Sequence, residues 1–189
     1  MGDDDNLTTL KAQSRAACLR ARDGAGERAR AAAATRLYAR LHGLRGRTIA
    51  AYLPIGSEAS PLGTMRVLAK DNCICVPIVT AKGAPLRFRE WWPGCPLDKG
   101  SFGVMVPVEG GWRVPDVLIV PMVGFDDAGG RLGYGGGFYD RTLAGLREAS
   151  VIGFALEAQR LDRVPRGKHD MELPLIVTEA GVFGAATRV

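Results

Sequence analysis

The sequence predicts a single α/β domain of three layers, in which helices cover both faces of a mainly parallel sheet. Three observations predict this fold class. Helical and strand-like patterns alternate along the chain, the apolar run 116–125 is typical of a strand buried on both faces, and no repeat or low-complexity linker interrupts the order. A chain of 189 residues can bury one core. We therefore expect residues 1–189 to form one domain.

The first elements should form a β-α-β unit that follows two helices. Residues 7–22 and 25–42 are rich in alanine and arginine and carry apolar residues at helical spacing, which predicts two helices. A short β-prone run predicts a strand over 47–53. A proline then begins an expected helix over 61–71, and a second strand is expected over 72–79.

The second half of the chain should complete the sheet. Residues 84–112 are dense in proline, glycine and aromatic residues, so irregular strand and loop are expected there. The buried strand 116–125 follows, then a helix over 138–149. Two further strands are expected over 151–157 and 173–181.

Composition indicates an ordinary globular protein, with 47% hydrophobic and 24% charged residues. The sequence contains no run of about 18 apolar residues, and its acidic start is not followed by an apolar signal segment. We therefore expect a cytoplasmic protein with no membrane partner. The net charge of +5 would suit a phosphate-rich ligand, nucleic acid or a solvated surface. No RNA-binding motif or zinc-finger spacing is present, so we expect no nucleic-acid partner. We also expect a monomer.

The segment RLGYGGGFYDR, residues 131–141, joins the buried strand to the expected helix. Ligands of open α/β sheets bind beyond the carboxyl ends of the strands, and a helix N-terminus there offers free N–H groups to phosphate. Glycines let the backbone approach an anion closely. The spacing matches neither the dinucleotide fingerprint nor the Walker loop, so a purely structural turn is the alternative. Arg131 could bind phosphate, and Asp140 could hold Mg²⁺ beside it.

Residues 121–140 also carry the order P-x-x-x-F-D-x-x-G-x-R-L-G-x-G-x-G-[YF]-Y-D. This order resembles the glycine-rich segment of the 5-formyltetrahydrofolate cyclo-ligase family, also called 5,10-methenyltetrahydrofolate synthetases, and the resemblance extends from about Lys11 to Asp170. It implies the substrates 5-formyltetrahydrofolate and ATP, with Mg²⁺ as cofactor. The implied reaction forms 5,10-methenyltetrahydrofolate, ADP and phosphate through a phosphorylated formyl intermediate.

The resemblance also assigns roles to individual residues. Arg131 and Tyr139 are implied to be catalytic, and Asp140 and Asp170 to bind the metal. Lys11 and Arg15, four apart on a helix, are implied triphosphate contacts, although a solvated basic face is the alternative. The implied ATP-binding residues are Lys11, Arg15, Arg131, Leu132, Gly133, Tyr134, Gly135, Gly136, Gly137, Phe138 and Tyr139.

The implied folate contacts are Leu53, Glu58, Phe102, Tyr134 and Phe138. Glu58, in the segment YLPIGSE, could accept hydrogen bonds from the donor edge of a pterin ring. Without the resemblance it would be interpreted as a surface-loop residue, and Phe102 has core packing as its alternative.

The chain departs from the family pattern at two places that bear on the site. Val106 stands before Pro107 where the family has glutamate, and Gly136 stands where some members have lysine. His169, next to Asp170, is interpreted as an exposed neutral histidine and not as a base.

Two other functions remain open from the sequence. A dinucleotide- or sugar-phosphate-binding enzyme could use a similar fold, although the G-x-G-x-x-G fingerprint is missing. A non-catalytic nucleotide- or RNA-binding protein could retain the pocket. The presence of both Asp140 and Asp170 favours catalysis.

Overall fold

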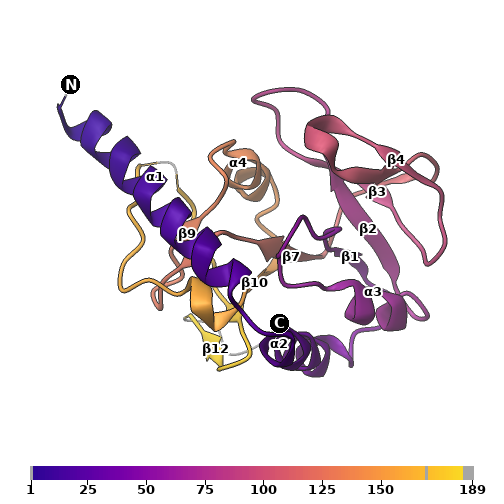
Figure 1. Ribbon diagram of the computed structural model, residues 1–189. Coiled ribbons are helices and arrows are strands. Elements are labelled where there is room, and N and C mark those ends of the chain that lie inside the picture. Colours follow the sequence, from indigo (N-terminus) through magenta and orange to yellow (C-terminus); the bar gives the residue numbers. More distant parts are fainter. Residues whose placement is uncertain (1, 169, 185–189) are drawn as a thin grey trace.

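The computed structural model describes residues 2–168 and 170–184 (Figure 1). His169 therefore lies outside the described residues. The expected helix 7–22 is observed as the longer α1 (Gly2–Asp23), and 25–42 as α2 (Glu27–Leu41). None of the helices in the described part of the chain is long and apolar enough to cross a membrane.

The central sheet is mainly parallel, as predicted. Within the described ranges it contains eight strands in the order β12-β11-β10-β7-β1-β2-β3-β6, and the five from β11 to β2 run parallel. Antiparallel strands β12, β3 and β6 complete the two edges. The parallel strands are β1 (Thr48–Ala50), β2 (Cys73–Ile78), β7 (Val117–Pro121), β10 (Ser150–Phe154) and β11 (Ile176–Val177), and the edge strands are β3 (Arg87–Glu90), β6 (Trp112–Arg113) and β12 (Val182–Phe183).

Helices cover both faces of the sheet, because successive strand residues point to opposite sides. Ile49 joins a core with α2 and with α3 (Leu62–Leu68). The next residue, Ala50, joins the opposite core with Leu143 of α4 (Phe138–Gly145). The predicted three-layer arrangement is confirmed.

Helix α1 lies outside these two cores, against the short 3-10 helix η2 (Glu157–Gln159) and strand β8 (Gly124–Phe125). Figure 1 shows it as a long helix that passes along one side of the molecule. The thiol of Cys18 points at the carbonyl of Gln159, at 3.7 Å. The face of α1 that carries Cys18 therefore packs against η2.

The structure contains two hairpins that the sequence patterns did not predict. Strand β8 pairs with β9 (Arg131–Leu132) directly after β7, so the apolar run 116–125 is two strands and not one. In the irregular middle section, β4 (Leu97–Lys99) pairs with β5 (Met105–Pro107) around the short helix η1 (Ser101–Gly103). Strands of two or three residues carry too little periodicity to be predicted.

Two residues of the family motif, Asp126 and Gly129, have a structural role in the β8–β9 hairpin. The Asp126 carboxylate accepts backbone N–H bonds from Ala128 at 3.1 Å, Gly130 at 2.8 Å and Val164 at 2.8 Å. Gly129 has φ +85°, and a Cβ there would collide with the carbonyl oxygen of Leu173. Aspartate and glycine therefore shape the turn that brings Arg131 to the site.

Candidate active site

A cavity of about 420 Å³ opens at the carboxyl ends of strands β1, β2 and β7. This is the edge at which α/β sheets bind ligands. The cavity brings together all the sequence-predicted site residues except Phe102. These residues are Lys11, Arg15, Leu53, Glu58, Arg131, Leu132, Gly133, Tyr134, Gly135, Gly136, Gly137, Phe138, Tyr139, Asp140 and Asp170. The role of each remains a prediction.

The glycine segment forms one wall of this cavity and leads into α4, which begins at Phe138 as expected. Gly137 is the N-cap residue with φ +63°, and Gly135 has φ +100°, both in the left-handed region that favours glycine. Gly133 and Gly136 do not adopt a positive φ. A Cβ at Gly136 would approach the Phe138 ring to 2.7 Å, so a lysine there would require this ring to move.

Three cations line the cavity together with residues 133–137, which we call the glycine wall. The Arg15 side chain donates from Nε to the carbonyl of Gly133 at 2.7 Å, and Lys11 pairs with Asp170 at 2.5 Å. Arg131 is buried, with 4% of its side chain exposed, and its Nη2 donates to Asp140 at 2.5 Å. Its Nε and Nη1 are also buried and have no partner among the residues that the structure describes. Buried donors without partners favour an anionic ligand at this point.

The two predicted metal-binding aspartates lie on the same side of the cavity. Asp140 Oδ1 accepts the N–H of Met171 at 3.1 Å in addition to the Arg131 bond, and Asp170 Oδ2 accepts the N–H of Gly167 at 2.7 Å. Burial alone would raise the pKa of Asp170, but the bonds from Lys11 and Gly167 outweigh it and hold that pKa below the ordinary value. In the described ranges, no group of three or more metal-ligating side chains occurs.

This donor set fits Mg²⁺ held with a phosphate ligand. Mg²⁺ is usually bound through one or two carboxylates together with substrate phosphates and waters, and does not need a complete protein cage. Each aspartate uses one oxygen for the contacts above, which leaves Asp140 Oδ2 and Asp170 Oδ1 without a hydrogen bond from the described residues.

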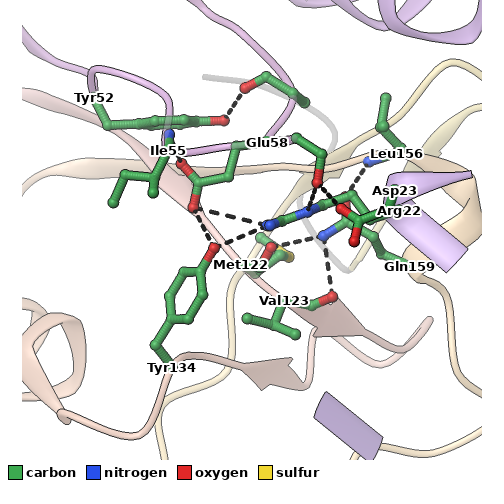
Figure 2. Close-up of polar contacts among 12 residues, drawn as sticks. Arg22, Asp23, Tyr52, Ile55, Glu58, Met122, Val123, Tyr134, Leu156 and Gln159 are labelled. Carbon is green, nitrogen blue, oxygen red and sulfur yellow. Dashed lines mark hydrogen bonds and ion pairs between the residues drawn. The ribbon is translucent and has the colours of Figure 1, made fainter. Parts of the chain in front are cut away.

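Glu58 also lines the cavity and is not a surface-loop residue, because only 4% of its side chain is exposed. Its Oε2 accepts the N–H of Ile55 at 2.9 Å, and its Oε1 accepts the hydroxyl of Tyr134 at 3.1 Å (Figure 2). Burial raises the pKa of Glu58, and the bonds from Ile55 and Tyr134 and the charge of Arg22 offset part of this shift. Leu53 lies on the same β1–α3 segment.

Phe102 lies outside the set of cavity residues. It is 77% exposed, which makes the core interpretation wrong, and its φ of 59° places it in the left-handed region. Its ring lies 6.0 Å from that of Phe138, edge to face. The neighbouring residues Ser101 and Val104 do line the cavity, as does Val106, which gives an apolar wall where the family pattern has a glutamate.

Two functional candidates, Arg22 and Tyr52, were missed by the sequence reasoning, whereas Arg141 belongs to the segment 131–141 that it singled out. Arg22 donates from Nη1 to the Tyr134 hydroxyl at 3.0 Å, and Tyr52 lines the cavity while its hydroxyl donates to Ala59. Arg141 donates from Nη2 to the carbonyl of Gly136 at 2.6 Å. Arg22 follows Arg15 by seven residues, or two helical turns, and this spacing could have placed it on the cavity side of the helix.

Fold and site together define an α/β protein with a glycine-walled, cation-lined cavity suited to a phosphate-bearing ligand. Comparison with known proteins gives the family. The model of the 5-formyltetrahydrofolate cyclo-ligase family matches residues 8–179, and the chain belongs to this family.

Individual relatives agree with this assignment. The chain is 33% identical to a 5-formyltetrahydrofolate cyclo-ligase of Mycolicibacterium smegmatis over 189 aligned residues, covering 89% of this chain and 93% of the relative. The structure of 5,10-methenyltetrahydrofolate synthetase from Aquifex aeolicus is similar at 30% identity, with 95% of both chains covered and a TM-score of 0.78. A synthetase from Mycoplasma pneumoniae shares the fold at 24% identity and a TM-score of 0.71, covering 89% of this chain and 98% of that one.

Proposed function

We propose that this protein converts 5-formyltetrahydrofolate to 5,10-methenyltetrahydrofolate, using ATP and Mg²⁺ and releasing ADP and phosphate. The observation that carries the proposal is that one cavity holds both a glycine wall with cations and a buried carboxylate, Glu58. The first suits a triphosphate, and the second suits the N–H donor edge of a pterin. Membership of the cyclo-ligase family supports the same reaction.

The residues of the glycine wall would bind and orient ATP. The N–H groups that begin α4 and the charges of Arg15 and Arg131 would bind the phosphate oxygens. The unpartnered donors of Arg131 would stabilise charge on the transferred phosphoryl group, with the Tyr139 ring 5.7 Å from its guanidinium. Asp140 and Asp170 would hold Mg²⁺, which supplies charge neutralisation to the phosphates when bound.

The proposed chemistry needs positioning more than a protein nucleophile. The formyl group is an amide, so its carbon is a weak electrophile. The formyl oxygen attacks the γ-phosphorus of ATP and ADP leaves. N10 then attacks the activated carbon and loses its proton to solvent, and the carbon–oxygen bond breaks to release inorganic phosphate. Catalysis would come from holding the formyl oxygen in line with the γ-phosphate and excluding water.

An isotope experiment tests the reaction and its intermediate together. The protein is incubated with ATP, Mg²⁺ and 5-formyltetrahydrofolate that carries ¹⁸O in the formyl group, and product and phosphate are analysed by mass spectrometry. The expected result is methenyl product with one label in each released phosphate and none in ADP. Omission of ATP or Mg²⁺ should abolish the product. Unlabelled phosphate would rule out the phosphorylated formyl intermediate.

The alternative is a non-catalytic nucleotide- or RNA-binding protein on the same fold, for which the net charge of +5 is the supporting observation. ATP binding without turnover would favour it. The proposal also includes one domain over residues 1–189, a monomer, a cytoplasmic location and no nucleic-acid partner, and these stay predictions. Size-exclusion chromatography with light scattering tests the monomer.

A further inference from the structure

A network of polar contacts joins Glu58 to the end of α1 (Figure 2), and the proposed reaction assigns no role to it. Arg22 lies in the last turn of that helix, and 5% of its side chain is exposed. Its Nη1 lies 3.9 Å from Glu58 Oε1, and the Tyr134 hydroxyl bridges the two, accepting from Arg22 at 3.0 Å and donating to Glu58 at 3.1 Å.

Arg22 is held in place from its other side. Its Nε donates to the hydroxyl of Ser57 at 3.0 Å, and that hydroxyl in turn donates to Asp23. Arg30 donates to the backbone carbonyls of Ser57 and Arg22. Arg22 does not belong to the residues that line the cavity, so any effect on a ligand acts through Glu58 and Tyr134.

The Tyr134 hydroxyl occupies an oxygen of Glu58 that a ligand would need. Glu58 Oε2 is already bonded to the backbone of Ile55, so Oε1 is the oxygen available to a donor from the cavity. Tyr134 is 54% exposed, so its ring has room to move toward solvent. The next residue, Gly135, has φ +100° and few restrictions on its backbone angles. A ligand N–H group could replace the tyrosine hydroxyl while the pair with Arg22 stays intact.

We propose that Arg22 is a positioning residue for folate binding, which holds Glu58 ionised and aimed into the cavity, and that the Tyr134 hydroxyl is a placeholder displaced by the N–H donors of the folate. An ionised carboxylate presents Oε1 as an acceptor, whereas protonation of that oxygen turns it into a donor that faces the N–H donors of the ligand. The inference rests on the proposed function through its folate substrate.

Arg22 is the charged group that can control the ionisation of Glu58. Among the described residues it is the one cation within ion-pair distance of that carboxylate. The other titratable groups that interact with Glu58 are tyrosines, namely Tyr134, Tyr52 and Tyr139. Burial raises the pKa of all three tyrosines, so they are neutral where Glu58 titrates.

The test is calorimetric titration of 5-formyltetrahydrofolate into the protein and its variants, from about pH 5 to about pH 9, a range that covers carboxylates raised by burial. Because binding needs ionised Glu58, affinity should rise with pH through the pKa of Glu58. Loss of Arg22 removes an interaction that lowers this pKa, so the rise should move to higher pH in Arg22→Gln. Near pH 7 its affinity should fall about 10- to 100-fold, and the deficit should shrink as the pH increases.

Arg30→Gln is the matched control, since Arg30 fastens the same loop without facing Glu58. It should weaken binding equally at every pH and leave the midpoint unchanged. Arg22→Lys keeps the charge, so the pH at the midpoint of its affinity profile should stay close to that of the wild type. This variant also provides the test if Arg22→Gln does not fold. Tyr134→Phe removes the placeholder together with a bond that lowers the pKa of Glu58, so it should bind folate more tightly at the alkaline end of the range, where Glu58 is ionised in both proteins.

Each outcome has a definite meaning. A loss of affinity in Arg22→Gln that is the same at all pH values would make Arg22 a structural pin and overturn the inference. Weaker binding of Tyr134→Phe at the alkaline end of the range would overturn the placeholder role. Binding does not require turnover, so pH-dependent folate binding without methenyl product would refute the proposed reaction and support the inference. A wild-type protein that binds no folate would overturn both.

Discussion

Replacement of Arg131 by alanine tests the assignment of the glycine wall to ATP. Arg131 is a buried cation whose Nε and Nη1 have no partner among the described residues, while its Nη2 donates to Asp140. We expect Arg131→Ala to weaken the binding of ATP much more than the binding of 5-formyltetrahydrofolate, because Arg131 pairs with Asp140 and, among the described residues, is not a bonding partner of Glu58.

The magnitude follows from the contacts. A hydrogen bond to a charged group contributes about 1.5–3 kcal/mol, so one lost phosphate contact should reduce ATP affinity about 10- to 100-fold. Stability should fall as well, since Asp140 loses its cation. Breaking a fully buried pair costs about 3–5 kcal/mol, but 22% of the Asp140 side chain is exposed and Met171 also donates to it. We therefore expect about 1–3 kcal/mol.

The assay is calorimetric titration with a non-hydrolysable ATP analogue and, separately, with 5-formyltetrahydrofolate, at a temperature well below the melting transition. Arg131→Lys keeps the charge but not the planar fork, so it should recover part of the ATP affinity. Arg160→Ala is the control, because Arg160 pairs with Asp127 and Glu157 and does not line the cavity. Equal losses for the two ligands, or no loss for ATP, would refute the assignment of Arg131 to phosphate.

Three further predictions concern the metal, the pH dependence and the turn before the site. Asp140→Asn should lower kcat steeply and raise the Mg²⁺ concentration needed for half-maximal rate, whereas unchanged Mg²⁺ dependence would count against a metal role. The pKa of Asp170 is depressed in the folded protein, so its pairing with Lys11 stabilises the fold above the ordinary pKa of 3.8 and this contribution is lost as pH falls through the folded value. Denaturant unfolding of Asp170→Asn should accordingly show a deficit at neutral pH that disappears in acid. Gly129→Ala should destabilise the protein by more than about 1 kcal/mol, measured in the same way, because of the positive φ and the collision with Leu173.

The parallel core of the fold was accessible from the sequence because long apolar runs and helical periodicity are local signals. The run around β7 predicted a buried strand and the run around β2 predicted a strand, and in the sheet both lie next to β1. The antiparallel additions were not accessible in the same way. Strand β6 has two residues, and its place at the sheet edge depends on pairing with Arg89 and Phe88 far along the chain.

The two sides of the site differ in the same respect. The glycine wall is one continuous segment, so a sequence motif is sufficient to predict which of its residues line the cavity. The environment of Glu58 is assembled from the end of α1, the β1–α3 loop and the glycine segment. Helix α2 and strand β1 lie between Arg22 and Glu58 in the sequence. Sequence patterns describe neighbours along the chain, and therefore gave no reason to expect a buried Glu58.

This difference has a consequence for how the two ligands would be recognised. Phosphate binding by backbone N–H groups depends on chain geometry at Gly135 and Gly137, which few other residues can adopt. Recognition by Glu58 depends instead on its charge state, which burial opposes and Arg22 supports. Substitutions at the glycines should therefore act on ATP at every pH, while substitutions around Glu58 should act on folate in a pH-dependent way. Since Tyr134 lies between Gly133 and Gly135 and also bonds to Glu58, it is the residue through which occupation of one side could alter the other.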